Sequence, residues 1–254
     1  MNPISLANSP SIWVAIGILA FLAGLLRGFA GFGSSLLLVP PLGIVLGPTV
    51  AVTVGTLLEC LATLLLFFPA IQHTDRRALA SLAVPASAAV PIGHAALILM
   101  NPYLSNLLIS IIILGLSVWV VSGSALRFPR GLLGRLFAGA LSGLFNGFGS
   151  AGGPPLMLYI LSGPESAEVK RANIITVSGV ALIAAVTSMY FFGFLRREAL
   201  TSGMLLAPIF FVGGLIGMYL FKAAPERYYQ RIALSALVVT STIMVVVNLI
   251  HITT

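Results

Sequence analysis

Long apolar stretches separated by short polar segments run through the whole chain, and this pattern predicts its elements. Most of them approach the ~20 residues that a helix needs to cross the hydrocarbon core of a bilayer. We therefore predict an all-α polytopic membrane protein with about 8–10 membrane segments. The clear stretches are 12–27, 50–69, 79–100, 105–123, 135–148, 172–192, 199–221 and 232–250.

Two shorter apolar pieces, 34–47 and 151–163, differ from the others because each contains a pair of prolines. Proline lacks a backbone N–H and clashes with the preceding helical turn, so neither piece is expected to form one regular helix through its pair. Both are predicted to be broken or half helices, which either cross the membrane or re-enter from one side. The pairs are Pro40-Pro41 and Pro154-Pro155.

The positions of lysine and arginine favour full crossing. If both short pieces cross and the amino terminus is outside, only Arg196 and Arg197 lie on the outer side. If both pieces re-enter, the remaining eight crossings divide the basic residues about evenly. Because basic residues concentrate in cytoplasmic loops, we predict ten crossings with both termini outside. The residues then placed on the cytoplasmic side are Arg27, Arg76, Arg77, Arg127, Arg130, Arg135, Lys170, Arg171, Lys222, Arg227 and Arg231.

The two halves of the chain resemble each other. A shift of 116 residues aligns 21–34 with 137–150, with 7 of 14 positions identical. We predict one transmembrane domain over 1–254, with repeat one at about 12–123, a linker at 124–134 and repeat two at about 135–250. Five crossings per repeat is an odd number, so the second repeat is inverted. A 5+5 inverted repeat with broken helices is typical of secondary transporters, whose site lies at the membrane midplane.

Two glycine- and proline-rich segments, 28–42 and 144–161, carry the candidate chemistry. Glycine allows the backbone to expose its N–H groups, and the positive end of a following half-helix favours an oxyanion. The alternative is that these small residues only allow close helix packing. The candidate substrate-binding residues are Gly31, Gly33, Ser34, Ser35, Asn146, Gly149, Ser150, Gly152, Gly153 and Asn173.

The runs GFGSSLLLVPPL and NGFGSAGGPPLMLYIL resemble the paired signatures of the TauE/SafE sulfite exporter family (TSUP). The resemblance covers most of the chain, including the repeat and the apolar profile. It implies a bacterial-type carrier in the cell inner membrane for sulfite, sulfoacetate or another organosulfonate. The first run has Ser34-Ser35 where glycine is common in the family, and two hydroxyls can coordinate a different anion.

Glu59 is the acidic residue predicted to lie deep in a span, where an ionised group costs about 3 kcal/mol or more. It is expected to be either a proton-coupling carboxylate or a protonated side chain bonded to neighbouring backbone. His94 is the second candidate coupling residue, because it can pair with Glu59 or titrate near neutral pH. Its alternative role is that of a hydrogen-bonded packing residue.

Polar residues also interrupt the spans that follow the two glycine-rich segments. They either line a translocation path or bond to their own helix backbone. Arg27 and Arg171 either attract anions at the cytoplasmic mouth or anchor the chain as positive-inside residues. The polar residues are Thr53, Thr56, Asn173 and Thr176.

Composition excludes several classes of protein. With 59% hydrophobic and 7% charged residues, the chain is neither a soluble domain nor disordered. The net charge of +7 would suggest nucleic acid for a soluble chain, but in short loops it indicates membrane orientation, so no nucleic-acid partner is predicted. The single Cys60 excludes a disulfide framework and a Cys-rich metal site. The first ten residues lack Lys and Arg, so the amino-terminal span is expected to be retained.

No GxSxG, HExxH or Walker motif is present, so no enzymatic activity, cofactor or metal is predicted. The sequence predicts a secondary transporter, in the export direction, for a small anion that moves by alternating access around a midplane site. The predicted partners are the anionic solute and the lipid bilayer, with a homodimer left open. An anion channel or uniporter, or a proton-coupled uptake carrier for a small organic acid, is the alternative, and the behaviour of Glu59 discriminates between them.

Overall fold

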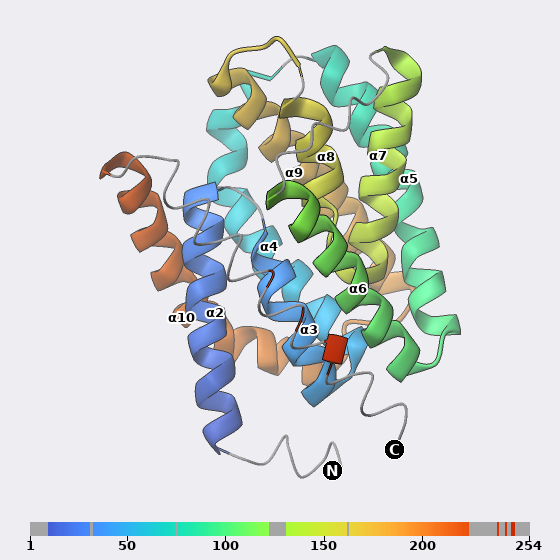
Figure 1. Cartoon of the computed structure of the whole chain (residues 1–254), viewed down its shortest axis with the longest axis vertical. Helices are drawn as coiled ribbons and strands as arrows, with labels where there is room; N and C mark the ends of the chain where they lie inside the picture. The colour runs from blue at the N-terminus through green and yellow to red at the C-terminus, as the bar shows by residue number, and fades with distance from the viewer. Residues whose placement is uncertain are drawn as a thin grey trace.

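The computed structural model describes residues 10–30, 33–74, 76–121, 131–161 and 163–223, with a few single positions beyond them. Its elements are all helices within these ranges, and they form one bundle (Figure 1). The helices are α2 (Pro10–Ala30), α3 (Ser34–Leu46), α4 (Pro48–Ile71), α5 (Arg76–Leu99), α6 (Pro102–Val121), α7 (Leu132–Gly149), α8 (Gly153–Leu161), α9 (Ala167–Phe191) and α10 (Arg197–Ala223).

Seven of the eight long apolar stretches coincide with helices, namely α2, α4, α5, α6, α7, α9 and α10, so these predictions are confirmed. The eighth, 232–250, lies outside the described residues except for four single positions. Within the described part, α2, α5, α9 and α10 are long and apolar enough to cross a bilayer. The chain is therefore a multi-pass helical membrane protein, while the number of ten crossings stays a prediction.

The two short pieces form helices, but their prolines do not interrupt them. Helix α3 continues through Pro40 and Pro41, so the prediction of a break at this pair is wrong. A proline inside a helix costs about 3 kcal/mol or more, and here the burial of every residue from Ser34 to Gly43 offsets that cost. In α8 the prolines occupy the first turn, where their missing N–H groups would have no partner inside the helix.

The interruptions lie instead in the glycine-rich segments before these prolines. Helix α2 ends at Ala30 and α3 begins at Ser34, while α7 ends at Gly149 and α8 begins at Gly153. The backbone is left-handed at Gly33, with φ 89°, and at Ser150, with φ 53°. Two backbone N–H groups, of Ser150 and Ala151, cap the end of α7 by bonding to carbonyls of its last turn.

Helix pairing follows a regular scheme. Helix α2 packs along α10 at one edge of the bundle and α5 packs along α7 at the other, while α4 and α9 contact each other between them (Figure 1). Small residues allow the close approaches at both edges. A side chain at Gly28 would collide with the carbonyl oxygen of Gly214, and one at Gly143 with the carbonyl oxygen of Ala86.

The largest apolar cluster surrounds α3 and α4 and includes the fully buried Leu38, Leu42 and Leu58. A second cluster, around Leu82, Leu156 and Val177, joins α5, α8 and α9. Large apolar side chains are also exposed along α2, α5 and α10, as is expected of helices that face lipid. The two clusters hold the short helices α3 and α8 in the interior, where both begin close to one pocket.

Candidate functional site

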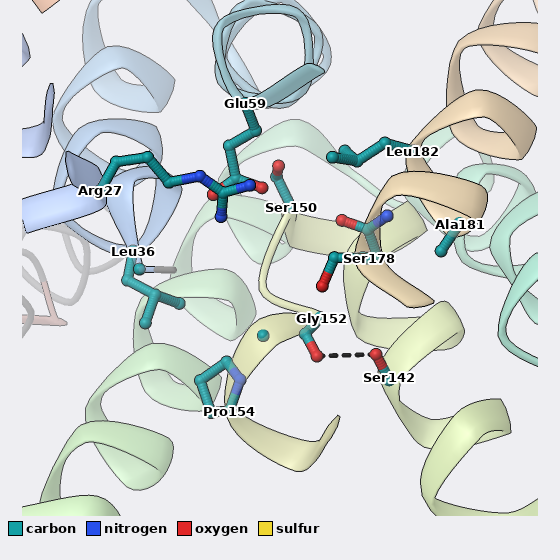
Figure 2. Close-up of a pocket in the computed structure, with 13 residues that line it drawn as sticks. Arg27, Leu36, Glu59, Ser142, Ser150, Gly152, Pro154, Ser178, Ala181 and Leu182 are labelled. Carbon is teal, nitrogen blue, oxygen red and sulfur yellow. Dashed lines mark hydrogen bonds between the residues drawn. The ribbon is translucent and has the colours of Figure 1, made fainter. Parts of the chain in front are cut away.

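A pocket lies where the beginnings of the two short helices approach α4, α7 and α9 (Figure 2). It encloses an empty volume of about 390 Å³, part of which is open space. Residues from both halves of the chain contribute, so the pocket joins the two glycine-rich segments. The lining residues are Arg27, Gly33, Leu36, Glu59, Ser142, Asn146, Ser150, Gly152, Gly153, Pro154, Ser178, Ala181 and Leu182.

Helix α7 presents a polar face to this pocket. Ser142 and Asn146 are four residues apart on α7, and side chains at this spacing share one face of a helix. Ser150 lines the pocket from the residue that follows the helix. The Ser142 hydroxyl donates to the carbonyl oxygen of Gly152 at 2.7 Å (Figure 2). This bond ties the start of α8 to α7 and leaves the Asn146 amide among the polar groups that line the pocket.

Hydroxyl groups connect the two halves at the same place. The Ser150 hydroxyl donates to the Ser35 hydroxyl at 3.2 Å, and the oxygens of Ser150 and Thr56 are 3.1 Å apart. Ser35 belongs to α3 and Thr56 to α4, whereas Ser150 follows α7. The left-handed backbone at Ser150 thus directs its side chain towards the first half, which accounts for a conformation that costs a non-glycine residue about 1–2 kcal/mol.

Arg27 brings a buried positive charge to the pocket. It is 4% exposed, although it stands near the end of α2. One guanidinium nitrogen donates to the Thr63 hydroxyl, while Nε is buried and has no hydrogen-bond partner. A buried guanidinium is stable only when paired, so Arg27 favours a negatively charged occupant of the space beside it.

Glu59 lines the same pocket from α4 and is 8% exposed (Figure 2). Its Oε1 accepts a hydrogen bond from the Ser34 hydroxyl at 2.9 Å and a second from the Ser35 backbone N–H at 3.3 Å. Both donors belong to the first turn of α3, where the helix dipole favours negative charge. The predicted bond between Glu59 and neighbouring backbone is therefore present. Its direction differs from that expected of a protonated carboxyl, because Glu59 accepts from an N–H, whereas a protonated carboxyl would donate to a carbonyl oxygen.

The other predicted site residues divide into two groups. Gly33, Gly152 and Gly153 line the pocket, whereas Gly149 lies against the Ile109 side chain. Asn173 is buried on α9 and is not among the lining residues. Gly31 lies outside the described residues.

His94 occupies a different place. It is fully buried on α5, its Nδ1 lies 2.9 Å from the Ser188 hydroxyl, and its ring stacks edge-on against Phe194 with centroids 4.9 Å apart. The structure thus pairs His94 with Ser188 and not with Glu59, whose bonds go to Ser34 and Ser35. These contacts are those of a packing residue that is hydrogen-bonded through Nδ1, while its Nε2 is buried and has no hydrogen-bond partner.

The remaining polar residues were predicted either to line a translocation path or to bond to their own helix backbone, and their hydrogen bonds differ accordingly. Thr53 donates to the carbonyl oxygen of Thr49 at 2.7 Å and Thr176 to that of Ala172 at 2.8 Å, so both bond to their own helix. Thr56 instead reaches the pocket residue Ser150.

Sequence reasoning missed Ser142 and Ser178, and it placed Arg27 at a cytoplasmic loop. The spacing of Ser142 from Asn146 was a signal for a shared helix face, but no comparable signal identifies Ser178. Arg27 is buried, so it does not lie at a loop surface as the loop-charge argument assumed. Across the described ranges, no three His, Cys, Asp or Glu side chains are grouped so that they could hold a metal ion.

The family model of the sulfite exporters TauE/SafE matches residues 16–244. The chain belongs to the TauE/SafE sulfite exporter family. This match spans both glycine-rich segments and all of the pocket residues. The comparison with curated proteins and the comparison with solved structures gave no match.

TauE/SafE proteins are membrane transporters and not enzymes, in agreement with the lack of enzyme motifs in the sequence. Membership therefore indicates a membrane transporter of sulfur-containing anions, which implies a small solute and membrane lipid as partners.

Proposed function

We propose that this TauE/SafE protein transports a small sulfur oxyanion, sulfite or an organosulfonate such as sulfoacetate, by alternating access around the pocket between α2, α3, α4, α7, α8 and α9. Export from the cytoplasm across a bacterial inner membrane is the direction that the family description favours. An inside-negative potential assists export of an anion by about 2.3 kcal/mol per charge for each 100 mV.

The observation that carries this proposal is the buried guanidinium of Arg27, whose Nε lacks a hydrogen-bond partner. Besides Arg27 and the Glu59 carboxylate, the polar groups that line the pocket are hydroxyl, amide and backbone groups. A sulfur oxyanion has several acceptor oxygens and no donors, unless it is protonated. A guanidinium with neutral donors around it is the matching set, because bonds from a charged donor to an oxyanion are roughly twice as strong as neutral ones.

Alternating access is supported by the arrangement of the helices. The pairing of α2 with α10 corresponds, through the sequence repeat, to the pairing of α7 with α5. The contact of α3 with α4 corresponds in the same way to that of α8 with α9. Two related units that meet at one pocket can rock against each other and open it to either side in turn. This scheme supports the proposed 5+5 inverted repeat, with repeats at about 12–123 and 135–250.

Solid-supported-membrane electrophysiology on the reconstituted protein tests the proposal. We expect sulfite or sulfoacetate to evoke transient currents that saturate with concentration, and acetate to evoke much smaller ones. Arg27→Gln removes the charged donor, and since a hydrogen bond to a charged group contributes about 1.5–3 kcal/mol, the apparent affinity falls by about 10- to 100-fold.

Arg197→Gln is the matched control, because Arg197 is exposed at the start of α10 and lies outside the pocket. It is expected to leave the currents within about twofold of wild type. Equal currents from the two variants would contradict the role of Arg27. Currents that persist without saturation would favour a channel over a transporter.

A further inference from the structure

Glu59 stands at the position where the sequence places the substrate. Ser34 and Ser35 were both expected to help hold an oxyanion at the beginning of α3. In the structure the Ser34 hydroxyl and the Ser35 backbone N–H donate to Glu59 Oε1, at 2.9 and 3.3 Å. A carboxylate is itself an oxyanion, so its use of these donors indicates what the site binds.

We propose that the Glu59 carboxylate is a built-in competitor for the anion site, so that each transported anion binds only when Glu59 has taken up a proton. This inference rests on the proposed function, because it assumes that the pocket binds an anion. It adds a coupling rule, which is one proton moved in the same direction with each anion. A monovalent anion then crosses without net charge, so the membrane potential assists the export only of anions that carry more than one negative charge.

The charges in the pocket lead to the same rule. Arg27 contributes one positive charge and Glu59 one negative charge, and both side chains are more than nine-tenths buried. A second anion beside an ionised Glu59 would leave one uncompensated negative charge in a place poor in water. With Glu59 protonated, the anion and Arg27 balance each other.

No other charged group disturbs this balance among the residues that line the pocket. The lining residues of α3, α7, α8 and α9 are uncharged, and α5, α6 and α10, which also contact α4, contribute none. Cys60 is the chain neighbour of Glu59 and is neutral as a thiol. His94 on α5 is bonded to Ser188. Arg27 and Glu59 therefore determine the charge of the described pocket.

The cycle that follows is balanced in protons and charge. On the loading side, Glu59 takes one proton from water and becomes a neutral acid, which is a much weaker acceptor for Ser34 and Ser35. The two donors then bond to an oxygen of the anion, whose charge is balanced by Arg27. On the other side the anion leaves, the proton returns to water, and the carboxylate bonds to Ser34 and Ser35 again.

The direct test is binding of ethanesulfonate to the purified wild-type protein between about pH 5 and pH 8, where this anion keeps a constant charge. We expect binding to tighten as the pH falls, by up to about tenfold per pH unit, which is the limit for a binding event that takes up one proton. A pH indicator in weakly buffered solution should then report close to one proton taken up for each anion bound. Sulfite, measured in parallel, serves as a second anion.

Glu59→Gln sharpens the test, because glutamine cannot carry the negative charge. The variant is expected to bind ethanesulfonate with an affinity that no longer depends on pH, and to lose accumulation driven by a proton gradient in liposomes. Glu198→Gln is the matched control, since Glu198 is exposed on α10 and lies outside the pocket. It should keep both the pH dependence and the accumulation of the wild type.

The outcomes separate the two proposals. Binding that is independent of pH, with no proton uptake, would overturn the coupling rule and leave the transport proposal standing. Failure of the wild type to bind either anion at any pH would overturn both. The wild-type measurements decide the matter even if Glu59→Gln does not fold.

Discussion

At the junction between α2 and α3 the left-handed residue is Gly33, whereas at the junction between α7 and α8 it is Ser150. The sequence repeat relates these two junctions, and at both of them the helical backbone is interrupted just before a short helix. Their side chains differ in kind. The first half brings the charged Arg27 and Glu59 to the pocket, while the second brings neutral groups such as Asn146.

The two halves therefore share a backbone arrangement but contribute different chemical groups to the same pocket. The interruption before a short helix is present in both halves, and glycines from both, Gly33 and Gly152, line the pocket. Among the residues that line the pocket, the charged ones, Arg27 and Glu59, both come from the first half. Under the proposed function and its coupling rule, the second half recognises the anion by shape and neutral hydrogen bonds. The first half supplies the charge balance and the proton coupling. Changes at matched positions of the two junctions should therefore have unequal effects.

The largest effect is expected at Gly152. An added Cβ there would lie 2.7 Å from the Ser142 carbonyl oxygen and 2.8 Å from the Asn146 Cβ, so Gly152→Ala must push α8 away from α7. Overpacking of this kind costs about 1–3 kcal/mol in stability. A displacement of about 1 Å in a site can cost about 100-fold in activity, and transport should fall by that amount.

Gly33→Ala is the comparable change in the first half, because Gly33 directly precedes α3 as Gly152 directly precedes α8. A Cβ at Gly33 would lie 3.4 Å from Leu26, an ordinary contact, so the cost is the left-handed backbone, about 1–2 kcal/mol. We expect lower thermal stability in detergent but a loss of transport below about tenfold. Equal transport losses in the two variants would contradict the different roles assigned to the two junctions.

A smaller effect is expected at Ser150, where the two halves touch. Ser150→Ala removes the bonds to Ser35 and Thr56 and keeps the left-handed backbone, for a loss of about 1–2 kcal/mol. Ser150→Gly removes the same bonds but relieves the backbone, so it should be about 1 kcal/mol more stable than the alanine variant. Thermal unfolding of both variants in detergent measures this difference. An alanine variant as stable as the glycine variant would rule out strain at this position.

Much of the fold could be predicted because each span must be apolar along its whole length to lie in hydrocarbon. That constraint is local and is visible in the sequence, which is why α2, α4 and α9 were found near their predicted places. The break predicted in α3 was wrong because the cost of its prolines is visible in the local sequence, whereas the burial that offsets this cost comes from surrounding helices.

The site could be predicted only in part, for a similar reason. Gly33, Ser150 and Gly152 stood out by composition, and the structure brings them to the pocket or its rim. The burial of Arg27 depends on which helices pack around it, and the bond between Ser34 and Glu59 joins residues 25 positions apart. Such contacts arise from tertiary packing, which the apolar pattern does not encode.

The central claim is that both halves of the chain hold one anion in a single pocket. Selenite is a close analogue of sulfite, and its selenium scatters X-rays anomalously, so a crystal structure of the protein with selenite locates the anion directly. The account predicts one anomalous peak within hydrogen-bond reach of Arg27 and of the Asn146, Gly152 and Gly153 groups. A peak elsewhere in the bundle, in a protein that transports selenite, would contradict it.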